Sequence, residues 1–375
     1  MSAGATYPLE LLVLQLSSFC NIDCKYCYLD SKDRQRQNLM PVAVMTRAIE
    51  SASRYPLLAK NFGVLLHAGE PLAAPKELFE KVAILVKQSF AGAPLLLVQT
   101  NATLIDQEWC DIFRRHNFRI GVSVDGPEAL HDAKRVRRNG SGTFKDTLRG
   151  IELLRRNEIN FNAICVVSST NVQHPRTLYS FFKGLGCKVV GFSPEEVDGA
   201  NPNSSLDEVA VESLDLFFEE LFKSLREDES PLFFREARNI FDFLKVEHVG
   251  GRYLLDNQMN RPGRILSVLA NGSISTYSPE LASVGSRFIY GNINEVEFTD
   301  IFKSDALQSD DAEIRRGIQK CKAECEIFEF CGGGTPSSKF SEHGIFNDSF
   351  TNWCRRSRVS LVNGAFRGLG NDKEF

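Results

Sequence analysis

Short apolar runs alternate with amphipathic segments through the first half of this 375-residue chain, and this alternation limits the folds that it can adopt. Each run has the length of a strand, and each segment between runs has the length and periodicity of a helix. The six apolar runs are 9–16, 62–69, 94–102, 119–126, 159–169 and 187–196. Such alternation is typical of βαβ units around a parallel sheet. Since a closed barrel needs eight repeats, we expect an α/β fold with an open, partial (β/α)6 barrel over residues 1–200.

The chain changes character after residue 200. Residues 201–260 contain two strongly amphipathic segments, 206–228 and 231–248. Their spacing of apolar residues predicts two helices, with Ser205 as the N-cap candidate of the first. We therefore expect a helical connector over residues 201–260.

The remaining part, residues 261–375, begins with a hairpin pattern. Asn271 and Gly272 separate two alternating apolar runs, which predicts a β-hairpin with a type I′ turn. The sequence beyond the hairpin is rich in glycine and cysteine, which suits wrapping around a metal centre better than packing a sheet. We expect a separate cysteine-rich extension here.

Bulk charge and the amino terminus exclude some partners. The net charge of −4 provides no basic field for a nucleic-acid backbone, so we expect no nucleic-acid partner. The first apolar run lacks a basic n-region and is too short to span a bilayer, so we expect a cytoplasmic protein without a membrane segment. In a reducing cytosol, ten unevenly spaced cysteines indicate metal or cluster ligation more than disulfides.

Three cysteines lie close together directly after the first expected strand. Cys20, Cys24 and Cys27 have the spacing C-x3-C-x2-C. In parallel α/β folds, ligands bind at the carboxyl ends of strands, which is where this loop begins. Three thiolates can hold a metal or cluster, but a tetrahedral zinc or a cube of four irons needs a fourth ligand. Either a distant residue supplies that ligand, or the coordination position is left open.

The motif, with Tyr26 directly before its third cysteine, resembles the signature of the radical S-adenosylmethionine (SAM) enzymes. The resemblance implies a 4Fe-4S cluster with three irons on the three thiolates and a free fourth iron that SAM chelates. It also implies that an electron from the cluster cleaves SAM to a 5′-deoxyadenosyl radical, which abstracts a hydrogen atom. A zinc knuckle is the alternative reading of the cysteines alone.

Further segments resemble the SAM-binding motifs of this family, in the family's order. The segment 68–71, AGEP, resembles the GGEP motif, whose backbone and carboxylate meet the methionine ammonium. Ala68 replaces its first glycine, and we expect the methyl group to be tolerated only with a negative φ. The segments 99–101 and 123–135 resemble the QTN and SxDGPxxxHDxxR motifs, in which the arginine pairs with the SAM carboxylate. The cofactor-binding residues implied by the resemblance are Tyr26, Ala68, Gly69, Glu70, Asn101, Ser123 and Arg135.

The distal cysteines resemble the SPASM extension of peptide- and protein-modifying relatives, which normally holds two auxiliary clusters. These four cysteines are Cys321, Cys325, Cys331 and Cys354. The hairpin region 261–281 has no cysteine, and Thr335 stands where the extension has a further one. The resemblance therefore implies only one auxiliary 4Fe-4S cluster, closed by four thiolates and suited to moving an electron. A zinc ribbon is the alternative. Reduction of the first cluster implies an electron donor such as flavodoxin or ferredoxin.

Three stretches, 192–199, 275–281 and 331–355, resemble the cyclophane-forming maturases of the Grr, Xye and Fxs types. Those enzymes abstract a β-hydrogen in a ribosomally synthesised precursor peptide and join the β-carbon to an aromatic ring. The resemblance implies the same reaction here. A formylglycine-forming sulfatase maturase is the alternative enzyme, although that group retains both auxiliary clusters. A binding module with structural zinc at both cysteine groups is the alternative without catalysis.

Three glutamates are candidates for roles beyond the cofactors. After a radical adds to an aromatic ring, one electron and one proton must leave, and a carboxylate can take the proton. We favour Glu280, just past the hairpin, near the position of the catalytic Asp in sulfatase maturases. Glu195 and Glu196 end the sixth run and are candidate substrate residues, but adjacent residues of a continuing strand point to opposite faces, so at least one should lie outside. A substrate contact and a place in the core are the two readings of His67, at the end of the second run, and we favour the core. We expect Cys110, Cys165 and Cys187 in buried apolar packing, without a ligand role.

Metal analysis after anaerobic purification tests the cluster assignment. Two 4Fe-4S clusters predict about eight irons per chain and a brown absorbance. Zinc without iron would contradict the prediction of an enzyme and favour the binding module.

Overall fold

The computed structural model describes residues 7–248, 257–283 and 285–370. Their strands form one sheet in the order β6-β5-β4-β3-β2-β1-β7-β8-β9. The bounds are β1 Leu9–Leu14, β2 Leu58–Leu66, β3 Leu95–Thr100, β4 Arg119–Ser123, β5 Phe161–Val167, β6 Val190–Pro194, β7 Ile265–Val268, β8 Ser273–Thr276 and β9 Gly291–Asn292. The six expected strands, β1 to β6, are all parallel, so the α/β partial-barrel prediction is confirmed. Parts of the expected domains, at 1–6, 249–256, 284 and 371–375, lie outside the described residues, and the domain boundaries stay a prediction.

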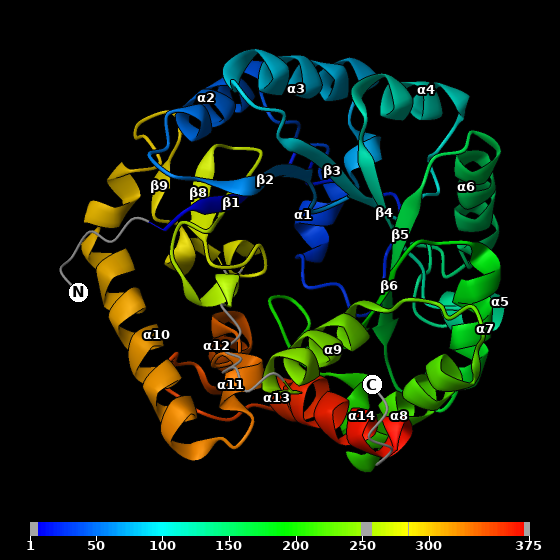
Figure 1. Ribbon diagram of the computed structural model, residues 1–375. Helices are drawn as coiled ribbons and strands as arrows, with labels where there is room; N and C mark the ends of the chain where they lie inside the picture. Colours follow the sequence, from blue (N-terminus) through cyan, green and yellow to red (C-terminus); the bar gives the residue numbers. More distant parts are fainter. Residues whose placement is uncertain (1–6, 249–256, 284, 371–375) are drawn as a thin grey trace.

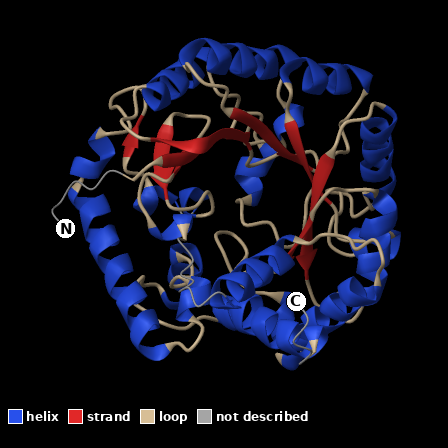
Figure 2. Cartoon of the chain, viewed as in Figure 1, coloured by secondary structure: helices blue, strands red, loops and turns tan. Residues whose placement is uncertain are grey.

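Helices follow the strands and surround the sheet (Figures 1 and 2). Those of the first half are α1 Ser31–Gln35, α2 Val42–Ser53, α3 Lys76–Ser89, α4 Gln107–His116, α5 Glu128–Asp132, α6 Phe144–Arg156 and α7 Pro175–Leu185. The later ones are α8 Glu212–Glu227, α9 Arg235–His248, α10 Asp305–Glu324, α11 Phe328–Cys331, α12 Pro336–His343, α13 Asn352–Cys354 and α14 Ser360–Leu369. Among the described residues, none of these helices has both the length and the apolar character needed to cross a membrane.

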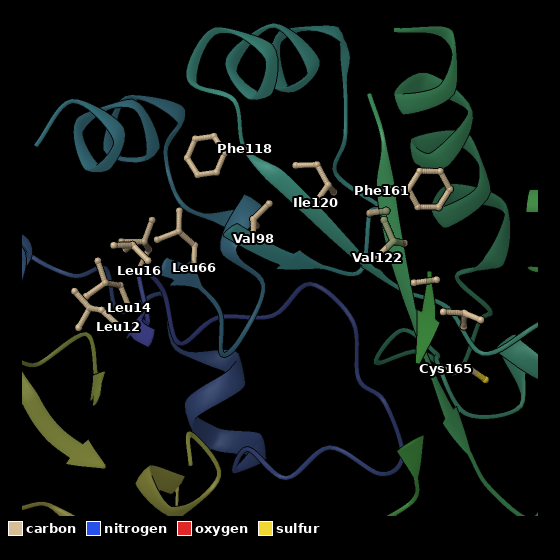
Figure 3. Close-up of a cluster of buried hydrophobic side chains, with 14 of the residues drawn as sticks. Leu12, Leu14, Leu16, Leu66, Val98, Phe118, Ile120, Val122, Phe161 and Cys165 are labelled. Atoms are coloured by element: carbon tan, nitrogen blue, oxygen red, sulfur yellow. The ribbon is translucent and has the colours of Figure 1, made fainter. Parts of the chain in front are cut away.

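A row of buried side chains crosses five parallel strands in register. Leu14 pairs with Leu66, which pairs with Val98, which pairs with Ile120, and Ile120 pairs with Phe161. All five side chains are buried, and Figure 3 shows them following one another along the sheet. Neighbouring residues of a strand point to opposite faces. On each strand, the residues directly before and after the buried one therefore face the inside of the barrel. The core row therefore determines which side chains reach the interior.

The hairpin is present, but its turn type was predicted wrongly. β7 and β8 pair antiparallel, and β7 also pairs in parallel with β1, so the hairpin extends the barrel sheet beyond the six expected strands. A type I′ turn needs a positive φ at both central residues. Of Asn271 and Gly272, only Gly272 has one, at 89°, and its N–H donates to Leu269 O at 2.8 Å. The glycine thus ends a four-residue loop over 269–272.

The N-cap prediction at Ser205 was also wrong. The capping side chain is that of Ser204, which accepts from Leu206 N and caps a short 3-10 turn over Ser205–Glu208. The α8 helix begins only at Glu212. The Ser205 hydroxyl instead donates to the carboxylate of Glu195 at 2.5 Å, because the connector folds back onto the end of β6.

The carboxyl-terminal helix α14 packs closely against α8. The approach depends on glycine, since a Cβ added at Gly364 would lie 2.5 Å from the Phe218 Cβ and 2.7 Å from the Glu219 backbone nitrogen. A Cβ at Gly368 would lie 2.5 Å from the Glu219 backbone oxygen. This contact attaches the end of the chain to the helical connector (Figure 1).

Gly364→Ala should lower the melting temperature, because its methyl group meets backbone atoms that cannot move away. The expected loss is about 1–3 kcal/mol, as for other overpacked sites. Gly184→Ala, in α7, is the matched control: its Cβ meets nothing within 4 Å, and alanine favours the helix by up to about 1 kcal/mol. A melting temperature of Gly364→Ala at or above that of the control would contradict close packing of α14 on α8.

Candidate active site

The carboxyl ends of the parallel strands surround a cavity of about 330 Å³, here called the central cavity. All candidate residues assigned to SAM, to the first cluster, to substrate and to proton transfer line it. They are Cys20, Cys24, Cys27, Tyr26, Ala68, Gly69, Glu70, Asn101, Ser123, Arg135, Glu195, Glu196 and Glu280. A cavity of about 440 Å³ at the opposite, amino ends of β4 and β5 contains none of them. The structure therefore brings these residues to one place, whereas their roles stay predictions.

The loop after β1 holds three thiols on one wall of this cavity. Cys20 N donates to Arg34 O at 2.9 Å, which fastens the loop to α1. N–H groups approach two of the sulfurs: Asn101 Nδ2 lies 4.0 Å from Cys20 Sγ, and Arg135 Nη1 lies 3.8 Å from Cys24 Sγ. Burial raises the pKa of all three thiols, that of Cys24 to about 12. Since metal ligands must be thiolates, binding of a metal centre has to release these protons. A half-buried group of thiols with N–H donors nearby fits an iron-sulfur cluster.

The turn after β2 departs from our expectation for Ala68. Its φ is +70°, although a negative value was expected. The chain turns sharply here, and Glu70 N thereby reaches Phe19 O at 2.8 Å. Gly69 follows with a φ of +76°, and a Cβ there would lie 2.6 Å from Ser17 O. Contacts with the cysteine loop thus hold Ala68 in a backbone region that costs a non-glycine residue about 1–2 kcal/mol.

The Glu70 carboxylate joins two strand ends. It accepts from Thr100 Oγ1 at 2.7 Å, from Asn101 N at 2.8 Å and from Leu72 N at 3.0 Å. Burial raises its pKa, although these hydrogen bonds oppose the rise. The Asn101 side chain continues the connection by donating to Asn21 Oδ1 at 2.9 Å. This network fixes the cysteine loop relative to the ends of β2 and β3.

A buried carboxylate, Asp125, connects two of the candidate SAM residues. Tyr26 Oη donates to Asp125 Oδ2 at 2.5 Å, and Arg135 Nε lies 3.1 Å from the same oxygen. The Arg135 guanidinium also lies over the Tyr26 ring, 5.4 Å from its centroid. Ser123 Oγ accepts from Gln99 Nε2 at 2.8 Å, and Gly121 leaves the space for the glutamine side chain.

Glu195 and Glu196 both line the central cavity. β6 ends at Pro194, so the alternation of a continuing strand, which would have turned one of them away, does not apply. Glu195 accepts from Ser205 N at 3.2 Å and lies 3.4 Å from Lys134 Nζ. Burial raises the pKa of Glu196 to about 8, with further contributions from two neighbouring carboxyls, Asp198 and Glu280.

Sequence reasoning missed three residues of this cavity. His67 was expected in the core, but it lines the cavity, with its Nε2 3.3 Å from Tyr28 Oη, and burial lowers its pKa to about 4. Tyr28 and Asp198 also line the cavity. Asp198 had a signal in the sequence, since it closely follows the sixth strand, where parallel folds collect functional side chains.

The four distal cysteines line a small separate cavity, here called the auxiliary cavity. Its donors suit thiolates: Lys339 Nζ lies 3.5 Å from Cys321 Sγ, and Gly334 N donates to Cys331 Sγ at 3.3 Å. Within the described residues, no three His, Cys, Asp or Glu side chains are placed to hold a single metal ion together. Thr335, at the position without a cysteine, caps α12. The three other cysteines, Cys110, Cys165 and Cys187, are buried, as expected.

Comparisons with known proteins identify the family. Residues 14–182 match the Radical SAM superfamily. An uncharacterized protein of Synechocystis sp. is 34% identical over 359 residues, which cover 93% of this chain and 89% of that protein. The chain belongs to the radical SAM superfamily. It is accordingly a radical SAM oxidoreductase, and enzymes of this superfamily use SAM together with a 4Fe-4S cluster.

This radical SAM enzyme is also similar to named relatives. A serine-type anaerobic sulfatase-maturating enzyme of Bacteroides thetaiotaomicron is 26% identical over 355 residues, 89% of this chain and 84% of that enzyme. The structure of hexahistidine-tagged anSMEcpe with bound AdoMet has a TM-score of 0.77 at 24% identity, and the match covers 95% of this chain and 96% of that one. Streptococcus suis SuiB bound to its precursor peptide SuiA has a TM-score of 0.67 at 17% identity. That match covers 92% of this chain and 76% of the SuiB chain. These structures share the fold.

Ala68→Gly should stabilise the protein, because glycine adopts a φ of +70° without the penalty of a Cβ. We expect a gain of about 1 kcal/mol, visible as a higher melting temperature. The control is Ala74→Gly, at a φ of −75°, which should destabilise the protein. Stabilisation by both variants, or by neither, would show that the turn at Ala68 is not strained.

Proposed function

We propose that this enzyme modifies a ribosomally synthesised precursor peptide, joining the β-carbon of one residue to the ring of an aromatic residue in a cyclophane. The proposal rests on the way in which the cysteines are divided between two cavities. Three thiols line the central cavity and four line the auxiliary cavity. This arrangement suits one cluster with a vacant coordination position and one closed cluster, as in the cyclophane-forming branch that the sequence resembles.

The central cavity would hold the reactive cofactors. Cys20, Cys24 and Cys27 would bind the first 4Fe-4S cluster, and the candidate SAM residues described above would bind SAM beside it. When bound, this pair supplies the 5′-deoxyadenosyl radical that removes a hydrogen atom from the substrate. The Glu70 network supports this assignment, because it holds the AGEP turn against the cysteine loop. Arg135 would pair with the SAM carboxylate while Asp125 holds its guanidinium.

The auxiliary cavity would hold the closed cluster on Cys321, Cys325, Cys331 and Cys354 and so provide an acceptor for one electron. This region reaches the central cavity, since Trp353, the residue before Cys354, interacts with the Glu196 carboxyl and opposes the rise of its pKa. We assign initial reduction of the first cluster to a separate donor, such as flavodoxin or ferredoxin.

A groove beside the central cavity supports a peptide substrate. It has a volume of about 570 Å³ and shares Leu29 and Ala68 with the central cavity. Pro279, next to the candidate base Glu280, also lines it. A chain in this groove could extend a residue into the central cavity. SuiB, which has the same fold, binds the precursor peptide SuiA.

The proposed reaction balances as a two-hydrogen oxidation of the peptide. The balance would require one electron to cleave SAM, with methionine and 5′-deoxyadenosine as the leaving products and the β-hydrogen carried away on the latter. The β-carbon then bonds to the ring, and the ring loses one electron and one proton to recover aromaticity. Glu280 is the candidate proton acceptor, and Glu195 and Glu196 are candidates for contact with the peptide.

Formylglycine formation is the second candidate, favoured by the sulfatase-maturating relative. It too begins with removal of a β-hydrogen from a peptide. Thr335 and the cysteine-free hairpin argue against it, because a second auxiliary cluster would lack those ligands. A serine converted to formylglycine also loses two hydrogens, so mass alone cannot separate the two reactions.

Co-expression with a small peptide encoded beside the gene tests the proposal. We expect a peptide that has lost two hydrogens, does not react with a hydrazine probe for aldehydes, and lacks fragment ions between the linked residues. A hydrazine-reactive product would support formylglycine formation and overturn the cyclophane proposal.

Cys354→Ala should abolish the cross-link, because the one electron that the ring must lose would have no acceptor. Formation of 5′-deoxyadenosine should partly persist, because it precedes that step. Cys20→Ala should abolish both, and Cys110→Ala, a buried core cysteine, should leave both intact. Mass spectrometry of the peptide and chromatography of 5′-deoxyadenosine measure the two outcomes. Full cross-linking by Cys354→Ala would refute the electron-acceptor role of the closed cluster.

A further inference from the structure

Three carboxyl side chains from two distant segments line the central cavity. Glu196 and Asp198 follow β6, and Glu280 follows β8. Asp198 was not among the sequence-based candidates. It is 3% exposed, and Ser341 Oγ donates to its Oδ1 at 3.0 Å. Its Oδ2 is buried and accepts no hydrogen bond from any residue that the structure describes. A buried carboxyl oxygen at a cavity wall without a donor is costly unless a proton or a substrate group satisfies it.

The charges around Asp198 come from several elements. Glu280, on the segment after β8, is its principal charged neighbour, and Tyr28, on the cysteine loop, lies near both carboxyls. Glu196, on the segment of Asp198, interacts with Trp353 and with the charge of Arg358, both from the carboxyl-terminal region, and both oppose the rise of its pKa. The cation Lys134 lies instead against Glu195. Burial and the charge of Glu280 raise the pKa of Asp198 to about 7, and burial raises that of Glu280.

We propose that Asp198 and Glu280 act as a pair that shares one proton in the resting enzyme and accepts the proton released by the substrate ring. The inference rests on the proposed function and extends it from one base to two. Two neighbouring carboxyls in a cavity cannot both ionise without a large electrostatic cost, so the second charge is replaced by a proton. The pair then carries a single negative charge and can take up one more proton.

The step balances. Once the ring has given up one electron, for which the closed cluster of the proposed function would be the acceptor, its C–H bond breaks. The proton moves to a carboxylate oxygen of the pair, and the two electrons of that bond return to the ring and restore its aromaticity. Ser341 holds Asp198 Oδ1, so Oδ2 is the oxygen left to receive a proton.

Infrared spectroscopy of the holoenzyme tests the shared proton without any substrate. Ordinary carboxyls ionise near pH 4, so a protonated carboxyl stretch that persists at pH 6.5 and disappears between about pH 7 and pH 9 belongs to perturbed groups. Glu196 also has a raised pKa and would give a similar band, so the variants are compared in a Glu196→Gln background. We expect the band to remain in that background and to be lost or shifted when Asp198→Asn or Glu280→Gln is added. Glu152→Gln, on the exposed side of α6, is the matched control and should leave the band unchanged. Absence of the band in the native enzyme, or its persistence unchanged in both variants, would overturn the inference.

A second measurement uses the co-expressed peptide that shows the two-hydrogen loss. Asp198→Asn should lower the ratio of cross-linked peptide to 5′-deoxyadenosine by at least about tenfold, since a general base contributes about 10²–10⁴ in rate. A merely structural role would instead lower both products together. If Asp198→Asn forms the cross-link with an unchanged ratio of cross-linked peptide to 5′-deoxyadenosine, the inference is overturned. If the infrared band is present but every peptide yields an aldehyde, the proposed cyclophane reaction fails and the shared proton stands.

Discussion

Parallel pairing of the strands is the constraint on which the rest of this structure depends. Since β1 to β7 all run in the same direction, their carboxyl ends meet at one edge, and the loops that follow them surround one cavity. The buried row from Leu14 to Phe161 sets the register of that sheet, and alternation then directs Gln99 and Ser123 inward. Residues far apart in the chain thus become neighbours because the backbone hydrogen bonds of the sheet leave no other arrangement.

The carboxyl-terminal part adds more than a second group of cysteines. Ser341 donates to Asp198, so a residue of the carboxyl-terminal part positions a side chain of the central cavity. The contact of α14 with α8 in turn fastens this part to the connector. The carboxyl-terminal part therefore contributes to the walls of both cavities.

Much of the fold and of the candidate site could be predicted, because the signals were local. Apolar runs predicted strands β1 to β6, and clustered cysteines predicted two groups that the structure gathers around two cavities. The errors concern backbone conformation and neighbours in space. The positive φ of Ala68 follows from contacts with the cysteine loop, the exposure of His67 to the cavity follows from the end of β2, and the loss of Ser205 as a cap follows from its bond to Glu195.

The sequence by itself determined the α/β class through its periodicity, the superfamily through its motifs, and the two groups of cysteines through their spacing, because all three are properties of the chain alone. Only the tertiary structure decided that β7 joins β1, that Glu195 and Glu196 both face the cavity, and that Asp198 and Glu280 line the same cavity. These outcomes depend on where a strand ends and on which distant segments meet. The physical reason is that burial and the approach of like charges arise between segments, and no pattern within one segment encodes them.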